Sequence, residues 1–287
     1  MNIEGFVKAI YRQQLRCEGV VVLQHGKKVA EHRWLPEAPR SCFSVSKSFV
    51  SIAIGMAVDR EKLSLNDRAA EFFPKLTHQA PKRLERLTLE HLLTMTRGYA
   101  TFSRPKTVAD AFAQTLQFEP GSRFVYDNGS TFLASAMFTR RMGITVRDFL
   151  LDALFGPLGM GEPEWADSPD GHTIGATGLM VTTTNLARFG QFLLQRGNWH
   201  GKQLVSATWI DRASRPHVGT GKRKRDWNLG YGLCFWPSSH GAYRADGKNG
   251  QFVIVLPHQN AVVAINSDDT MHTPILHTVW DHILPLL

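Results

Sequence analysis

Strand-like segments stand at both ends of this 287-residue chain, and helical segments fill the middle. Residues 19–23 and 28–34 form β-branched or alternating runs around a turn, which is the pattern of an antiparallel hairpin. Four more strand-like runs come late in the chain, at residues 230–236, 242–245, 251–256 and 261–265. The simplest way to pair them is one antiparallel sheet to which both chain ends contribute.

Helix patterns complete this prediction. An amphipathic helix is expected over residues 3–16 and a final helix over residues 274–286. Further helices with recognisable ends are expected between the strands, the longer ones at residues 128–142, 146–154, 184–196 and 206–213. We therefore predict an α+β fold in one domain, residues 1–287, with an α/β sub-lobe (1–43 plus 226–287) and an inserted helical sub-lobe (44–225).

The composition excludes several classes of protein. Hydrophobic residues make up 43% of the chain and charged residues 20%, as in ordinary globular domains. No run approaches the ~18 apolar residues of a membrane span, and residues 1–19 lack the apolar centre of a signal peptide, so a cytoplasmic location without membrane association is expected. The net charge is +8, but its densest cluster, Lys222-Arg223-Lys224-Arg225, has no accompanying nucleic-acid motif and is expected to be a solvated loop.

The three cysteines, Cys17, Cys42 and Cys234, are too few for a disulfide framework. No spacing of Cys and His residues points to a metal, so neither a metal nor another cofactor is expected.

Ser44-Val45-Ser46-Lys47 is the first candidate functional motif, at the start of an apolar segment that reads as a buried helix. A serine and a lysine three residues apart lie on one helical face. A buried lysine with a lowered pKa can take the proton of a serine hydroxyl, which makes the serine a nucleophile. The simpler alternative is that Ser44 only caps the helix. Cys42, two residues earlier, is interpreted as a small buried residue.

The same S-x-x-K spacing recurs at Ser103-Arg104-Pro105-Lys106. Pro105 disfavours helical angles at Arg104, so this second match is interpreted as chance.

Two later segments add candidate groups. In Tyr126-Asp127-Asn128, a phenol whose pKa is lowered by a nearby ammonium could exchange the serine proton, and the amide of Asn128 could bind both substrate and lysine. Alternatively Tyr126 is a buried residue after a turn and Asn128 a helix cap. In Ala245-Asp246-Gly247-Lys248, a glycine at a strand end lets a substrate approach the backbone, although a simple hairpin turn explains it too.

In this order the three segments resemble the serine β-lactamase and penicillin-recognising superfamily, in its branch of class C β-lactamases, carboxylesterases and D-alanyl-D-alanine peptidases. The likeness covers roughly residues 19–270. It extends to framework stretches, which are Leu87 to Gly98, Glu119-Pro120-Gly121, and Gly175-Ala176-Thr177-Gly178-Leu179.

The resemblance implies a serine hydrolase that works through an acyl-enzyme. Ser44 would attack an ester or amide carbonyl, Lys47 and Tyr126 would share the proton transfers, and Asn128 would orient substrate and Lys47. The backbone amides of Ser44 and Lys248 would hold the oxyanion, and water would release the acyl group.

One departure from the family limits the substrate. Where β-lactamases carry Lys-Thr-Gly, this chain has Ala245-Asp246-Gly247, and Asp246 would repel a substrate carboxylate. Asp246, Gly247 and Lys248 are the predicted substrate-binding positions. Lys248 could offset the repulsion, but its direction relative to the site is open because neighbouring strand residues alternate faces. We therefore expect a small neutral or amine-bearing ester or amide, of the kind cleaved by relatives resembling 6-aminohexanoate-oligomer hydrolases. A catalytically idle binding or sensor protein on the same scaffold, and a true β-lactamase or D,D-peptidase, remain the alternatives, and the oligomeric state is open.

Overall fold

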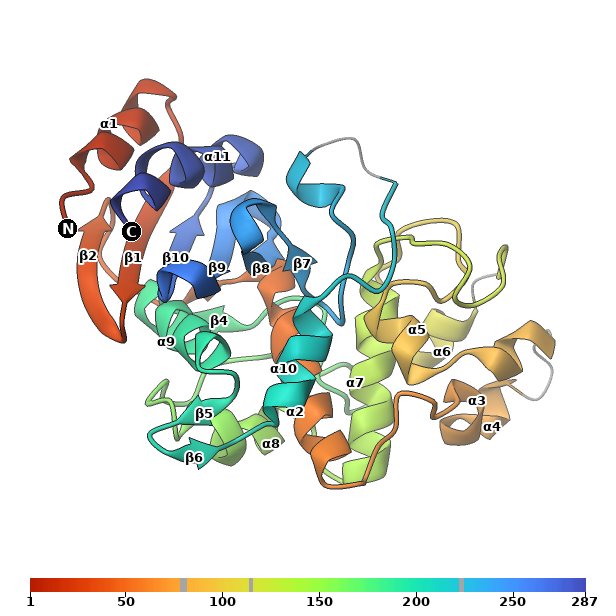
Figure 1. Cartoon of the computed structure of the whole chain (residues 1–287). Helices are drawn as coiled ribbons and strands as arrows, with labels where there is room; N and C mark the ends of the chain where they lie inside the picture. The colour runs from red at the N-terminus through yellow and green to blue at the C-terminus, as the bar shows by residue number, and fades with distance from the viewer. Residues whose placement is uncertain (78–81, 114–115, 222–224) are drawn as a thin grey trace.

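The computed structural model, which describes residues 1–77, 82–113, 116–221 and 225–287, contains a six-stranded antiparallel sheet with the order β2-β1-β10-β9-β8-β7 (Figure 1). Its strands are β1 (Cys17–Gln24), β2 (Lys27–Arg33), β7 (Trp236–Pro237), β8 (Tyr243–Gly247), β9 (Gln251–Leu256) and β10 (Ala261–Ser267). Strand β1 pairs with β10, so the N-terminal hairpin joins the C-terminal strands as predicted. Two-stranded sheets are formed by β3 (Arg40–Ser41) with β4 (Met180–Val181), and by β5 (Asn198–Trp199) with β6 (Lys202–Gln203).

Helices cover both faces of the large sheet (Figure 1). Helices α1 (Glu4–Arg12) and α11 (His272–His282) pack together on one face, and α9 (Thr183–Leu194) packs on β1, β9 and β10 from the other. Every residue of β9 and β10 is therefore buried, which explains why these strands are almost continuously apolar in sequence.

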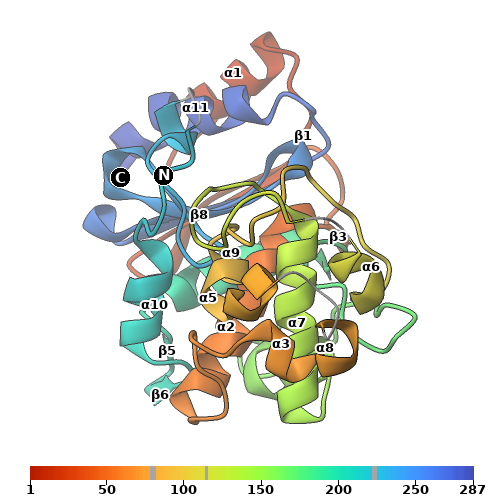
Figure 2. The ribbon, with the colours of Figure 1, turned by 90° about the vertical axis from the view of Figure 1, so that its right-hand side faces the viewer.

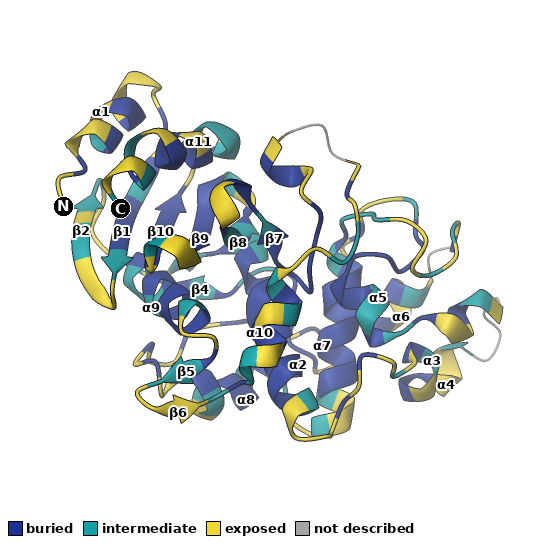
Figure 3. Ribbon diagram, in the orientation of Figure 1, coloured by how far each residue is buried: buried dark blue, intermediate teal, exposed yellow. Residues whose placement is uncertain are grey.

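Two long helices form the centre of the helical lobe, α2 (Ser46–Asp59) and α7 (Asn128–Met142), and they pack against each other (Figure 2). Both are buried along most of their length (Figure 3). The smaller helices are α3 (Ala69–Phe72), α4 (Pro74–Thr77), α5 (Leu89–Leu93), α6 (Val108–Phe112), α8 (Val146–Leu150) and α10 (Ala207–Ser214). Single turns are η1 (Phe43–Val45), η2 (Lys82–Arg86), the π-helical η3 (Leu151–Phe155), η4 (Arg225–Trp227), η5 (Ser239–Gly241), η6 (Lys248–Gly250), η7 (Pro257–Gln259) and η8 (Leu284–Leu286).

Some predicted bounds were wrong for local reasons. The strand expected at residues 230–236 is reduced to Trp236–Pro237, because Gly230 and Cys234 adopt left-handed angles (φ 102° and 65°) that bend the chain out of the sheet. The first helix ends at Arg12, and Gln14 then adopts φ 54°. Residues 222–224 of the basic cluster lie outside the described residues. Among the described helices, none has the length and hydropathy needed to cross a bilayer.

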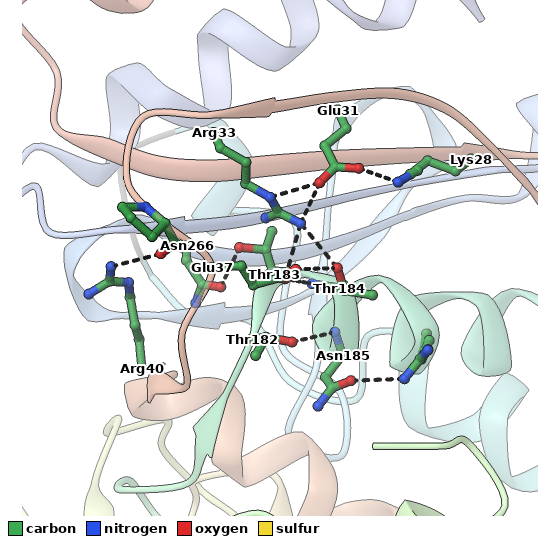
Figure 4. A network of polar contacts seen from close by, with 12 residues as sticks. Lys28, Glu31, Arg33, Glu37, Arg40, Thr182, Thr183, Thr184, Asn185 and Asn266 are labelled. Atoms are coloured by element: carbon green, nitrogen blue, oxygen red, sulfur yellow. Dashed lines mark hydrogen bonds and ion pairs between the residues drawn. The ribbon is translucent and has the colours of Figure 1, made fainter. Parts of the chain in front are cut away.

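A polar network fixes the connector that leads from β2 to the first motif (Figure 4). Glu37 accepts hydrogen bonds from the backbone amide (2.9 Å) and hydroxyl (3.0 Å) of Thr184, and it pairs with Arg33 at 3.0 Å. Next to it, the hydroxyl of Thr183 donates to Asn266 on β10 at 2.7 Å. The connector is thereby tied to the start of α9 and to the sheet before the chain reaches Ser44.

Candidate active site

Ser44 lies in the tight turn that joins β3 to α2. The amide of Cys42 donates to the carbonyl of Leu179 at 2.9 Å, which continues the β3–β4 pairing up to the turn. Phe43 then adopts φ 45°, an unusual angle for a bulky residue, and Ser44 follows in η1. Strained residues of this kind cluster at functional sites because the surrounding structure holds them in place. The prediction that the serine precedes a buried apolar helix is confirmed.

Lys47 is 1% exposed, and its ammonium has three acceptors. Its Nζ donates to Ser44 Oγ at 3.0 Å, to Asn128 Oδ1 at 2.7 Å and to the carbonyl oxygen of Ala176 at 2.6 Å. Burial lowers the pKa of Lys47 from 10.5 to about 7. The lysine therefore lies against the serine in the protonation range that a general base needs, as the sequence predicted.

Tyr126 lies beside this pair at the start of α7, with Lys47 Nζ 5.1 Å from its ring centroid. Its ring stacks near that of Trp236, with centroids 5.8 Å apart. Burial raises the pKa of Tyr126 well above its usual value, and a hydrogen bond with Ser44 opposes that shift only in part. The expectation of a lowered tyrosine pKa was wrong, because desolvation outweighs the hydrogen bond with Ser44. Tyr126 is therefore a neutral phenol at ordinary pH.

The third segment reaches the same place from the sheet. Strand β8 ends at Gly247, and a Cβ atom there would collide with the backbone carbonyl oxygen of Cys42. Only glycine allows the strand end to come this close to the turn that carries the serine. Lys248 follows in η6, and both Ser44 and Lys248 line one cavity. The two backbone segments expected to form an oxyanion hole are thus brought together.

Asp246 has a partner that the sequence did not reveal. Its carboxylate lies 3.0 Å from Nε of Arg244, whose side chain is fully buried and lies 4.5 Å above the ring of Trp227. Burial raises the pKa of Asp246, and the Arg244 guanidinium partly offsets the rise. Because the two formal charges cancel, the repulsion of a substrate carboxylate by Asp246 is weaker than expected from the sequence. What the site lacks at this position is a free cation or hydroxyl.

The cavity has a volume of about 750 Å³ and is mainly apolar in lining. This is a usual size for a small-molecule site. Beside the motif residues it is lined by aromatic side chains from separate segments, which are Phe43, Phe102, Phe132, Trp227 and Trp236. The helical lobe and the sheet therefore both contribute to it.

The remaining sequence interpretations can be placed as well. Ser103 lies in a non-helical segment, as expected for a chance S-x-x-K match, and Lys106 does not line the cavity. Cys42 is buried, and burial raises the pKa of its thiol to about 12. Sequence reasoning missed Ala176, Arg244 and the tryptophans. Ala176 acts through its carbonyl, which no residue type signals, whereas Arg244 was detectable as a charge of opposite sign two residues before Asp246 on the same strand.

Comparisons with known proteins agree with this architecture. The family model described as Beta-lactamase matches residues 3–281. A β-lactamase of Escherichia coli (strain K12) is 29% identical over 267 residues, which cover 83% of this chain and 67% of that protein. A β-lactamase of Yersinia enterocolitica is 31% identical over 167 residues, which cover 55% of this chain and 41% of that protein.

Solved structures show the same fold. A candidate 6-aminohexanoate-dimer hydrolase from Bacillus anthracis superposes with a TM-score of 0.81 at 20% identity, covering 96% of this chain and 80% of that one. An octameric penicillin-binding protein homologue from Pyrococcus abyssi gives a TM-score of 0.78 at 18% identity, covering 99% and 76%. The ordered motifs, the fold and the match over nearly the whole length establish that this chain belongs to the β-lactamase family of serine hydrolases.

Proposed function

We propose that this protein hydrolyses a small neutral or amine-bearing ester or amide through an acyl-enzyme on Ser44. The observation that carries the proposal is the 3.0 Å contact between Ser44 Oγ and Lys47 Nζ, together with a lysine pKa of about 7. A neutral lysine amine has two N–H donors and one lone pair. With Asn128 Oδ1 and the Ala176 carbonyl accepting its two protons, the lone pair faces the serine hydroxyl.

The proposed reaction has two steps, acylation of Ser44 and hydrolysis of the acyl-enzyme. Lys47 takes the hydroxyl proton while Ser44 Oγ attacks the carbonyl carbon, and the resulting oxyanion is held by the backbone amides of Ser44 and Lys248. The carbon–leaving-group bond breaks, and the leaving group takes a proton, delivered from Lys47 through the neutral phenol of Tyr126. In the second step water attacks the acyl ester and gives a proton to Lys47, and Lys47 passes that proton to Ser44 Oγ as the bond between Ser44 and the acyl carbon breaks and the acid departs. Asn128 orients Lys47 and the substrate.

The substrate class rests on the third segment. Ala245 is buried and Asp246 is paired with Arg244, so this strand offers no free cation to a β-lactam carboxylate. A neutral substrate needs none at this position, and an amine would meet the carboxylate of Asp246 there, although Lys248, which follows the strand, also lines the cavity. The name of the Bacillus anthracis structural neighbour, a candidate 6-aminohexanoate-dimer hydrolase, is consistent with this choice.

A β-lactamase is the second candidate, favoured by the names of the curated relatives. One set of assays separates the candidates. Purified protein is incubated with 4-nitrophenyl butyrate, with a fluorophosphonate probe and with a cephalosporin, alongside Ser44→Ala and the matched control Lys106→Ala. We expect ester turnover and probe labelling in the wild type and in Lys106→Ala, neither in Ser44→Ala, and poor cephalosporin turnover. Efficient cephalosporin hydrolysis would support the β-lactamase, and the absence of both turnover and labelling would support an idle binding protein.

A further inference from the structure

The segment of residues 102–106 contributes to one wall of the cavity, and it holds a large apolar side chain that is open to solvent. Phe102, Arg104 and Pro105 from this segment all line the cavity. Phe102 is 48% exposed, and the guanidinium of Arg104 lies 5.3 Å from its ring centroid. A large ring left in contact with water at a cavity wall is a contact surface for an apolar group that enters the cavity.

Ser103, between Phe102 and Arg104, is buried at 4% exposure while both neighbours face the cavity. Its amide and its hydroxyl both donate to Asp127 Oδ1, at 2.8 Å and 2.6 Å. Successive side chains of an extended segment point to opposite sides. Holding Ser103 inward therefore turns Phe102 and Arg104 outward.

Asp127 joins this wall to the second motif. It stands between Tyr126 and Asn128, and its other oxygen accepts from the amide (2.8 Å) and hydroxyl (3.1 Å) of Ser130 in α7. The buried Arg97 lies 2.6 Å from Asp127 and donates to Ser103 Oγ at 2.8 Å.

Gly129 leaves the space for this cluster. A Cβ atom there would lie 2.6 Å from both Arg97 Nη2 and Ser103 Oγ. One carboxylate thus binds the cavity wall, the start of α7 and the motif that carries Tyr126 and Asn128.

We infer that Ser103 is a positioning residue for substrate selection: through Asp127 it fixes Phe102 in the cavity wall, where Phe102 contacts an apolar extension of the substrate. The inference rests on the proposed hydrolase function and narrows its substrates to esters or amides with an extended apolar acyl or alcohol part. Ser103, the serine of the second S-x-x-K match, then affects substrate selection by holding the cavity wall in place.

Selectivity for chain length is the direct test. The ratio of kcat/KM for 4-nitrophenyl octanoate to that for 4-nitrophenyl acetate is measured for wild type, Phe102→Ala, Ser103→Ala, the double variant and Lys106→Ala. A parallel series of octyl and ethyl acetates, followed by acid release, examines the alcohol side. We expect the preference for octanoyl or octyl substrates to fall about tenfold in Phe102→Ala. Burying a phenylalanine side chain against a ligand changes the affinity by roughly one to two factors of ten.

Ser103→Ala is expected to lower the same ratio by a similar factor, mainly through a higher KM for the long ester. The ratio of the double variant is expected to fall no further than that of either single variant. Lys106→Ala, on the same segment but away from the cavity, should keep the wild-type ratio. Thermal unfolding of each variant accompanies the kinetics, and Ser103→Thr, which keeps the hydroxyl, should restore the ratio.

Two results would overturn the inference: an unchanged ratio in both series, which includes equal losses on short and long esters, or fully additive losses in the double variant. In each of these the wild type still hydrolyses esters through Ser44, so the proposed function stands. If the wild type turns over neither series, the proposed function and this inference both fail.

Discussion

The carbonyl oxygen of Ala176 lies 2.6 Å from Nζ of Lys47, closer than the hydroxyl of Ser44. This backbone acceptor, with Asn128 Oδ1 at 2.7 Å, holds the lysine in place whether or not the amine is charged. The proton that it loses is therefore the one that faces the serine, as the proposed role of Lys47 as general base requires.

Activity is expected to depend on pH through Lys47. Because burial lowers the pKa of this amine to about 7, the neutral base form is lost as pH falls below that value. kcat/KM should rise with pH and level off above about pH 7. Lys47→Arg, which stays charged, should lower kcat by about 10²–10⁴. A profile flat from pH 5 to 9, or one that rises only near pH 10, would contradict this assignment.

Tyr126→Phe separates a proton donor from a base. The raised pKa keeps the phenol neutral, so its removal costs a hydrogen bond to the reacting atoms but not the titrating group. We expect kcat to fall by about 10² while the inflection near pH 7 remains. If the inflection vanishes with the hydroxyl, Tyr126 rather than Lys47 is the base.

Gly247→Ala tests the close approach of β8 to the serine turn. The new methyl group would collide with the Cys42 carbonyl oxygen, and a backbone atom cannot rotate away. Both the unfolding free energy and kcat should fall, the former by about 1–3 kcal/mol as in other overpacked sites. Gly219→Ala is the matched control, since its added Cβ meets nothing within 4 Å and both properties should be retained. Wild-type kcat in Gly247→Ala would disprove the geometric requirement.

Asp246→Asn tests the ion pair between Asp246 and Arg244 on strand β8. The buried guanidinium of Arg244 would lose its carboxylate partner at 3.0 Å, and hydrogen bonds to charged groups contribute about 1.5–3 kcal/mol. Urea unfolding should show a loss of that order. Asp211→Asn, which breaks an exposed pair with Arg196, should change stability little. Equal effects in the two variants would indicate that the Arg244 pair contributes no more than a surface pair.

The cysteines should be unreactive in the folded protein. Burial raises the pKa of the thiols of Cys17, Cys42 and Cys234 to about 12, so almost no thiolate forms near neutrality. Iodoacetamide at pH 8 should leave the native protein unlabelled and modify all three residues in urea. Rapid labelling of Cys42 in the native state would reopen the question of which residue before α2 is nucleophilic.

Most of the fold could be predicted from local sequence patterns. Strands β9 and β10 were predictable because both their faces are covered and their sequences are therefore continuously apolar. Helix α7 was placed at its observed bounds because Gly143, at φ 70°, ends it. The segment before β7 was misplaced because its bends depend on tertiary packing: Gly232 lies against the carbonyl of Ala213, and Tyr231 bridges to Val218.

The parts of the candidate site that depend on side-chain type could be predicted from the sequence. Ser44, Lys47, Tyr126, Asn128 and Gly247 were named from the sequence, and the structure brings them around one cavity or against its turn. The pKa of Tyr126 was not predictable, because its sign depends on how much solvent the fold removes. The same is true of Asp246, whose charge matters only together with the Arg244 guanidinium packed behind it.

The pairing of β1 with β10 has a consequence for the order in which this protein can assemble. The turn that carries Ser44 is made early in synthesis, but the strand that supports it from the other side, β8, is completed only after residue 247. Contacts between such distant segments have a high entropic cost of loop closure and form late. A ribosome-bound chain therefore carries Ser44 before the backbone amide of Lys248 can reach it, and the proposed site is complete only when the last strands dock.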